Sequence, residues 1–230
     1  MRELKISKRS FLNGVAAGSA GITAAAFGAS LPFAGSAWAQ DVEIPDSQGN
    51  VDMEEALKPG PLPEITLGDE NAPVKIIEYL SMTCPHCADF QEGTFPAIKE
   101  NFIDTGKVYY IFREFPFDPR AMAGFMLARC APNGKYIPFM DMMFSKLRTW
   151  ATAEDGSAAM LQMAKLAGFT QESFQACLTD QDLLNDINGV RERAAEEFGV
   201  RATPTFLING KKYSGDMSVD TMSALINSML

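Results

Sequence analysis

Residues 84 to 87 of the chain read Cys84-Pro85-His86-Cys87. The motif follows a run typical of a strand, Val74 to Leu80, and precedes a run typical of a helix, Ala88 to Asp104. A Cys-x-x-Cys pair at a strand-to-helix junction indicates redox-active thiols. The first helical turn has unpaired N–H groups and the positive end of the helix dipole, and both stabilise a thiolate. We therefore predict that Cys84 is the reactive sulfur and that Cys87, one turn into the helix, is less exposed.

His86 is the only histidine of the sequence, and it stands between the two cysteines. A protonated imidazole there would add to the stabilisation of a Cys84 thiolate. The alternatives are half of a zinc site and two unrelated buried cysteines. Zinc needs about four ligands, and the other two cysteines, Cys130 and Cys177, are too far apart in sequence to form a second ligand pair. Spacing and context favour redox chemistry.

A longer stretch around the motif carries a family resemblance. The run Gly68 to Tyr79, GDENAPVKIIEY, followed by the motif, resembles the DsbA family of exported thiol:disulfide oxidoreductases. The dipeptide Pro85-His86 is similar to that of strongly oxidising members, and Thr203-Pro204-Thr205 is similar to the family's cis-proline loop. The resemblance covers residues 67 to 230. It implies an α/β, thioredoxin-like fold with an inserted all-helical subdomain.

Glu78 lies inside the predicted strand, on the same face as Ile76 and Leu80 by period-two alternation. A carboxylate on a buried face is costly unless it is paired or protonated. The residue is therefore either a strand-end acid that reaches solvent or a proton acceptor for the Cys87 thiol. Its position six residues before Cys84 is similar to that of the family's buried glutamate, which favours the catalytic role.

Thr203 and Pro204 form the second expected part of the site. In the family, this proline is cis and faces the Cys-x-x-Cys motif, which leaves the backbone of the preceding residue free to pair with an extended substrate. An ordinary trans proline before a strand is the alternative. Thr203 differs from the valine often found at this position in strongly oxidising members, so the redox potential and the choice of partner stay open.

Cys130 and Cys177 lie in the predicted helical region. As buried free thiols they would be unremarkable, but an oxidising compartment favours pairing. Some members of the DsbA family carry a second, non-catalytic disulfide in the helical region. We therefore expect a structural disulfide between Cys130 and Cys177, which would destabilise the unfolded chain by about 4 kcal/mol on the loop-entropy model.

The first 39 residues have the pattern of an export signal. Basic residues precede an apolar stretch at 11–33, and Ala37-Trp38-Ala39 forms a small-x-small cleavage site. Residues 7–12 resemble a twin-arginine signal in which Lys8 replaces the first arginine. An uncleaved membrane anchor is the alternative, although the alanines and glycines would make it a weak one. We expect a cleaved signal peptide at 1–39 and a periplasmic protein.

The length of 230 residues and the hydrophobic content of 47% suit one globular domain with an insertion. We expect an N-terminal arm at 40–63, a thioredoxin-like domain at 64–117 and 199–230, and a helical insertion at 118–198. The net charge of −9 argues against nucleic acid, which is bound through clustered lysines and arginines.

These features predict an exported oxidase that donates its Cys84–Cys87 disulfide to newly secreted proteins. The resemblance implies no cofactor and no metal, reduced or unfolded secreted proteins as substrates, and reoxidation by a DsbB-like, quinone-linked membrane oxidase. Two alternatives stay open. One is a disulfide isomerase or reductase of the same fold, and the other is a periplasmic chaperone that binds peptides or a metal.

Overall fold

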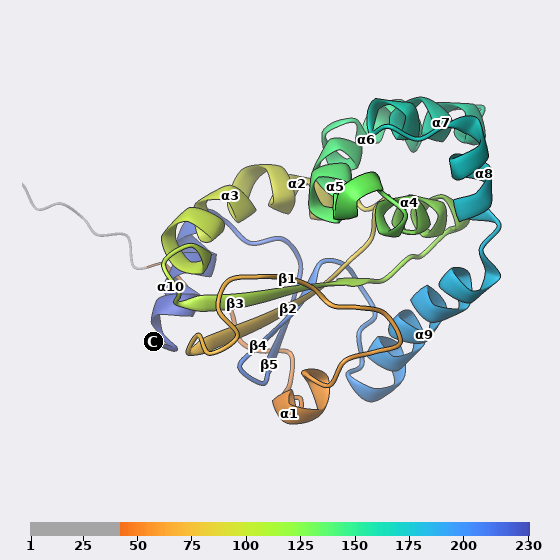
Figure 1. Ribbon diagram of the computed structural model, residues 1–230. Helices are drawn as coiled ribbons and strands as arrows, with labels where there is room; N and C mark the ends of the chain where they lie inside the picture. Colours follow the sequence, from red (N-terminus) through yellow and green to blue (C-terminus); the bar gives the residue numbers. More distant parts are fainter. Residues whose placement is uncertain (1–41) are drawn as a thin grey trace, which may run out of the picture. The chain divides into compact units, whose positions relative to one another are not determined.

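A five-stranded sheet in the order β1-β3-β2-β4-β5 forms the centre of the fold (Figure 1). The computed structural model describes residues 42–230, so the predicted signal peptide lies outside the described residues. β2 and β3 are parallel, and the other neighbouring strands are antiparallel. The strands are β1 (Ile65–Leu67), β2 (Val74–Leu80), β3 (Val108–Glu114), β4 (Thr205–Ile208) and β5 (Lys211–Ser214).

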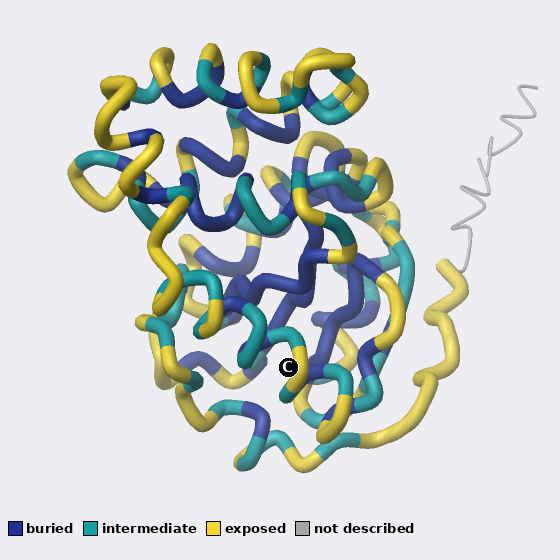
Figure 2. Tube along the Cα trace, turned by 90° about the vertical axis from the view of Figure 1, so that its right-hand side faces the viewer, coloured by how far each residue is buried: buried dark blue, intermediate teal, exposed yellow. Residues whose placement is uncertain are grey.

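Helices cover both faces of the sheet, which explains why the central strand β2 is apolar on both sides. Ile76 and Leu80 pack into the larger core, together with the helix that follows the Cys-x-x-Cys motif and with α10 (Val219–Asn227). Ile77 and Tyr79 point to the other face, where α1 (Met53–Ala56) and α9 (Gln181–Glu197) cover the sheet. Figure 2 shows the strands buried between these exposed outer layers.

The helix begins at the motif, as predicted, and contains two wider turns. It runs through α2 (Pro85–Asp89), a π-helical turn η1 (Phe90–Thr94), α3 (Phe95–Ile98) and a second π-helical turn η2 (Lys99–Ile103). Pro96 has no N–H to donate to a carbonyl of the preceding turn, and η1 ends two residues before it. The hydrophobic period predicted the helix but not these wider turns.

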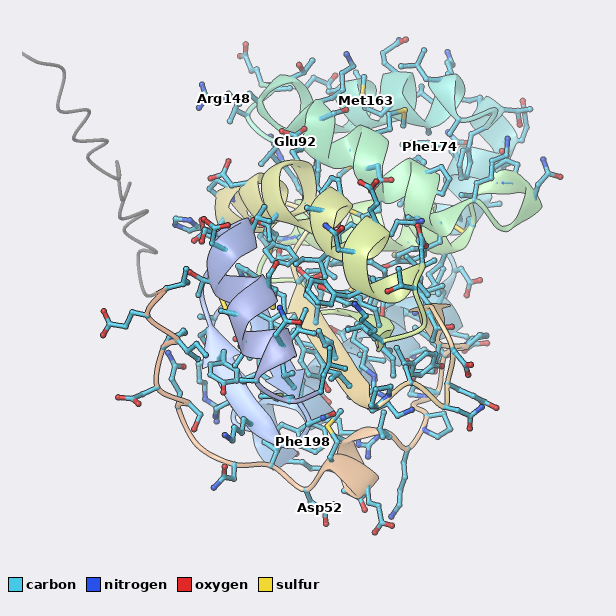
Figure 3. All side chains as sticks on the ribbon, turned by 90° about the vertical axis from the view of Figure 1, so that its left-hand side faces the viewer. Asp52, Glu92, Arg148, Met163, Phe174 and Phe198 are labelled. Atoms are coloured by element: carbon cyan, nitrogen blue, oxygen red, sulfur yellow. A yellow bond between two sulfur atoms is a disulfide. The ribbon has the colours of Figure 1, made fainter. Side chains whose placement is uncertain are left out.

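The helical segment between β3 and β4 consists of several short helices. They are α4 (Pro119–Arg129), the 3₁₀ turn η3 (Pro132–Gly134), α5 (Tyr136–Ser145), α6 (Leu147–Trp150), α7 (Gly156–Leu166), α8 (Gln171–Leu178) and α9. The hydrophobic period of the sequence predicts one helix over 135–149, but the structure divides it into α5 and α6 at Lys146. The indole N–H of Trp150 donates to the Met143 carbonyl (2.7 Å). In a continuous helix, this carbonyl would instead accept a hydrogen bond from a backbone N–H of the next turn. In Figure 3, Met163 and Phe174 lie within this helical segment. The α/β architecture with inserted helices is therefore confirmed.

The N-terminal arm runs along the exposed edge of β5. The N–H of Gln48 donates to the Lys212 carbonyl (2.8 Å), the N–H of Lys212 donates to the Gly49 carbonyl (3.0 Å), and the N–H of Val51 donates to the Gly210 carbonyl (2.8 Å). These bonds satisfy backbone groups that an edge strand would otherwise leave open to pairing with other chains. Within residues 42–230, no helix has both the length and the apolar composition needed to cross a membrane.

Candidate redox site

Cys84 and Cys87 occupy the junction between the end of β2 and the start of α2. Cys84 is the N-cap residue of α2 and is partly exposed, whereas Cys87 lies inside the helix and is fully buried. Both carry free thiols in the structure. An incoming sulfur can therefore reach Cys84 but not Cys87.

The surroundings of Cys84 favour its thiolate. Hydrogen bonding by the Cys87 thiol is the largest cause that lowers the pKa of Cys84, to about 5. The hydroxyl of Thr203 and the backbone N–H groups of Cys87 and His86 lower it further, while burial opposes them. Burial has the opposite effect on Cys87, whose pKa is raised well above its ordinary value. The two sulfurs of one motif therefore differ strongly in their tendency to ionise.

Thr203 and Pro204 lie directly beside Cys84, although 119 residues separate Thr203 from that cysteine in sequence. The Thr203–Pro204 peptide bond is cis. The Cys84 thiol donates to the carbonyl of Thr203 at 3.2 Å. The Thr203 hydroxyl is buried and has no hydrogen-bond partner of ordinary geometry among the described residues, so it is free to donate to a Cys84 thiolate.

Glu78 is fully buried on the face of β2 that also packs against α2. Its Oε2 atom accepts hydrogen bonds from the Tyr110 hydroxyl and from Nε2 of Gln91, both at 2.8 Å. Burial raises the pKa of Glu78 to about 8, because the charged form loses its hydration. The Glu78 charge in turn contributes to the raised pKa of Cys87, so the carboxyl acts on the buried sulfur.

The chain is similar in sequence and structure to known thiol-disulfide proteins. A family model described as Thioredoxin matches residues 62–228. The crystal structure of alpha-DsbA1 from Wolbachia pipientis has a TM-score of 0.71 and 32% sequence identity to this chain, and the match covers 77% of this chain and 96% of that one. The chain belongs to the DsbA family.

Two relatives of this DsbA chain have names that refer to disulfide chemistry. A Rickettsia typhi protein named as a protein-disulfide oxidoreductase is 28% identical over 168 residues, which are 73% of this chain and 62% of that protein. The disulfide bond formation protein D of Bacillus cereus is 29% identical over 174 residues, covering 72% of this chain and 78% of the relative. The DsbA chain thus spans less than two thirds of the length of the Rickettsia typhi protein.

The imidazole of His86 lies at the surface, beside the loop before α10. Its side chain is exposed, and Nδ1 lies 3.2 Å from Oδ1 of Asp216 in the loop before α10. The backbone N–H of His86, and not its imidazole, is among the causes that lower the Cys84 pKa. The exposed side chains of His86, Asp89 and Asp216 have potential metal-ligand atoms within 4.8 Å of one another, but this group includes neither cysteine.

Three further residues at the DsbA site were not identified from the sequence. Gln91 and Tyr110 hold the Glu78 carboxyl, and Asp118 accepts a hydrogen bond from Thr83 at 2.5 Å, directly before Cys84. Helical spacing could have indicated Gln91, which stands one turn after Cys87. The bond to Asp118 joins residues 35 positions apart and has no local signal.

Cys130 and Cys177 form a disulfide in the helical segment, with their Cα atoms 6.1 Å apart. Cys130 is the C-cap residue of α4, and Cys177 lies in the last turn of α8. The bond therefore ties two helices of this segment together.

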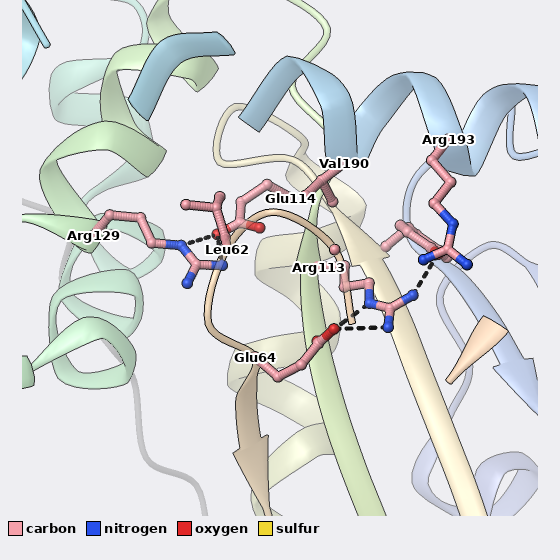
Figure 4. A pocket seen from close by; sticks show the side chains of 9 residues that line it. Leu62, Glu64, Arg113, Glu114, Arg129, Val190 and Arg193 are labelled. Atoms are coloured by element: carbon pink, nitrogen blue, oxygen red, sulfur yellow. Dashed lines mark hydrogen bonds and ion pairs between the residues drawn. The ribbon is translucent and has the colours of Figure 1, made fainter. Parts of the chain in front are cut away.

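A cluster of ion pairs lines a small cavity and contains neither redox cysteine (Figure 4). Arg113 pairs with Glu64 at 2.8 Å, and Arg129 pairs with the fully buried Glu114 at 2.6 Å. The space between the side chains is about 10 Å³, which is room for about one water molecule. This cluster is a structural contact and not a substrate pocket.

An open groove of about 430 Å³ lies next to the cis-proline loop. The N–H of Gly215 donates to the Pro204 carbonyl at 2.9 Å, which fixes the start of the groove beside the proline. Tyr213 and Met217 supply apolar surface, and residues of the N-terminal arm line the opposite side.

Proposed function

We propose that the chain is an exported thiol oxidase that donates its Cys84–Cys87 disulfide to newly secreted proteins. One observation carries the proposal, which is the opposite environment of the two sulfurs. Cys84 is accessible and its pKa is lowered to about 5, whereas Cys87 is buried and its pKa is raised. A stabilised thiolate favours the reduced protein and makes the disulfide a strong acceptor of electrons.

The reaction proceeds in two exchanges. A substrate thiolate attacks the Cys84 sulfur, a mixed disulfide forms, and the Cys84–Cys87 bond breaks with both electrons passing to Cys87. Cys87 then takes up a proton, which Glu78 is placed to supply. A second substrate thiolate attacks the sulfur of the first, the substrate disulfide forms, and Cys84 leaves as a stable thiolate. Two electrons pass from the substrate to the protein.

Thr203 and Pro204 position the substrate in this mechanism. The backbone of Thr203 lies against Cys84, and an extended substrate segment pairs there through main-chain hydrogen bonds. The adjoining groove accepts the residues that follow in the substrate. Main-chain recognition of this kind suits an enzyme that acts on many unfolded proteins.

Export and reoxidation rest on the leader sequence and on the family. The signal pattern in residues 1–39 directs the chain to the periplasm, where substrates are reduced or unfolded secreted proteins. Reoxidation of the two thiols requires an electron acceptor. A DsbB-like, quinone-linked membrane oxidase supplies it, and this partner approaches Cys84 because Cys87 is buried.

Thr203 favours a second function of the same site, as an isomerase or reductase. Its hydroxyl lies beside Cys84, at a position where strongly oxidising members often carry valine. The redox potential distinguishes the two functions, since a value near that of thioredoxin, about −270 mV, indicates a reductase.

The test is oxidation of a reduced, unfolded substrate by the oxidised protein, followed by mass spectrometry. We expect one substrate disulfide for each protein disulfide consumed, loss of the reaction in Cys84→Ser, and a trapped mixed disulfide in Cys87→Ser. Full activity of Cys84→Ser would contradict the proposal and would favour a binding role. Faster repair of a scrambled substrate by the reduced protein would instead indicate an isomerase.

A further inference from the structure

Besides the Thr203 hydroxyl, two buried oxygen atoms near the redox cysteines have no hydrogen-bond partner among residues 42–230. They are Oε1 of Glu78 and Oε1 of Gln91. Glu78 is fully buried, and Gln91 is 6% exposed. The two residues already touch through their other atoms, because Nε2 of Gln91 donates to Oε2 of Glu78 at 2.8 Å. Buried oxygens without partners are costly, so this pair needs an explanation.

The hydrogen bonds of Glu78 determine where a proton would sit on its carboxyl group. Oε2 accepts from both the Tyr110 hydroxyl and the Gln91 amide, which occupies its two lone pairs. A proton added to Glu78 must therefore bind Oε1. The new O–H group is a donor, and the unpaired oxygen of the same Gln91 amide is a ready acceptor.

One protonation thus satisfies both orphaned atoms. A carboxylic acid and a primary amide can form two antiparallel hydrogen bonds, because each presents one donor and one acceptor on neighbouring atoms. If Glu78 were ionised instead, its Oε1 atom would carry negative charge in a buried site without a donor.

The other groups around Glu78 offer no positive charge. No lysine or arginine donates a hydrogen bond to it within the described part of the chain. The neighbouring strands place Phe112 and Phe206 opposite it. The titratable groups that act on Glu78, or on which it acts, come from the cysteine helix, β3 and α5, and they are Cys84, Cys87, Tyr110 and Tyr136. All four are neutral or negative.

We propose that Gln91 is a positioning residue whose amide pairs with neutral Glu78 through both of its polar atoms and holds that carboxyl in the protonated state. The role of this pairing in catalysis, described next, rests on the proposed function. When Cys87 leaves as a thiolate, the O–H bond of Glu78 breaks and the S–H bond of Cys87 forms. The negative charge stays on Glu78 until a proton returns from solvent. In the reverse exchange, Glu78 takes the proton from Cys87.

The direction in which the Glu78 pKa shifts when the Gln91 amide is removed distinguishes this two-bond pairing from a single hydrogen bond donated by Gln91. A Gln91 that only donates its N–H to the carboxylate would lower the pKa of Glu78. A Gln91 that also accepts the acid proton stabilises the neutral form and raises this pKa. Removing the amide therefore shifts the Glu78 pKa upward in the first case and downward in the second.

The experiment is ¹³C NMR titration of the Glu78 carboxyl in the oxidised protein, where neither redox cysteine titrates. The signal is assigned with Glu78→Gln. We expect Gln91→Met, which keeps the side-chain length and removes both polar atoms, to shift the midpoint to lower pH. Tyr110→Phe is the matched control, because it removes a donor from the same oxygen and is expected to shift the midpoint to higher pH. An upward shift or no shift in Gln91→Met would overturn the proposal.

A second variant covers the case in which Gln91→Met does not fold. Gln91→Glu replaces the amide with an acid that can share one proton with Glu78, so we expect one carboxyl of the pair to stay protonated to high pH. Titration of both carboxyls in the ordinary range of glutamate would also overturn the pairing. The titration needs no substrate, so its result is independent of the oxidase assay with Cys84→Ser.

Discussion

Replacing Cys87 should make Cys84 less acidic, because hydrogen bonding by the Cys87 thiol is the largest cause that lowers the Cys84 pKa. A hydrogen bond to a charged group is worth about 1.5–3 kcal/mol, and about 1.4 kcal/mol corresponds to one pH unit. Cys84 is only half-buried, so the lower end of this range applies. We therefore expect Cys87→Ala to move the ionisation midpoint of Cys84 upward by about one pH unit.

The assay is the rate of Cys84 alkylation by iodoacetamide between pH 3 and pH 10. Cys84 is the single reactive thiol of the variant, because Cys130 and Cys177 are paired. Cys87→Ser is the matched control, since its hydroxyl can still donate to the thiolate and should keep the midpoint near that of the wild type. If the ionisation midpoint of Cys84 is the same in Cys87→Ala and in the wild type, the Cys87 thiol does not stabilise the Cys84 thiolate.

Three further outcomes are expected. Thr203→Val removes the hydroxyl that donates to the Cys84 thiolate, so the Cys84 pKa should rise in the same alkylation assay, and an unchanged midpoint would contradict that contact. With both redox cysteines as free thiols, Glu78 has a folded pKa raised to about 8 against an ordinary 4.5. Its contribution to stability is therefore present below pH 4.5 and is lost as the pH rises to 8, by up to about 1.4 kcal/mol per pH unit. Urea unfolding of Glu78→Gln should lack this decline, and parallel curves for variant and wild type would refute it. The double variant Cys130→Ala/Cys177→Ala should unfold with a free energy lower by up to about 4 kcal/mol, and equal urea midpoints would show that the bond adds no stability.

Several strands could be predicted to the residue because their signals are local. The apolar run at 74–80 matches β2, and the Asn209-Gly210 pair, whose residue types favour a hairpin turn, forms the turn between β4 and β5. Both turn residues have positive φ, 44° for Asn209 and 88° for Gly210, which these residue types tolerate better than others. Such features depend on a few neighbouring residues, so sequence reading finds them.

The parts that were missed depend on contacts between distant residues. The sequence gives no sign that the His86 imidazole contacts Asp216, which is 130 positions later. The helix predicted over 135–149 breaks because the Trp150 indole takes the Met143 carbonyl. No local sequence pattern predicts either contact, since each depends on the tertiary packing of the chain.

The redox potential of the Cys84–Cys87 pair between pH 6 and pH 7 tests the central claim most directly. With Cys84 ionised and Cys87 protonated in the reduced protein, two electrons are taken up with one proton. Equilibration with glutathione should therefore give a potential that falls by about 30 mV per pH unit. A fall of about 59 mV per pH unit would mean that two protons are taken up. Cys84 would then be an ordinary thiol at neutral pH, and the proposed driving force would not exist.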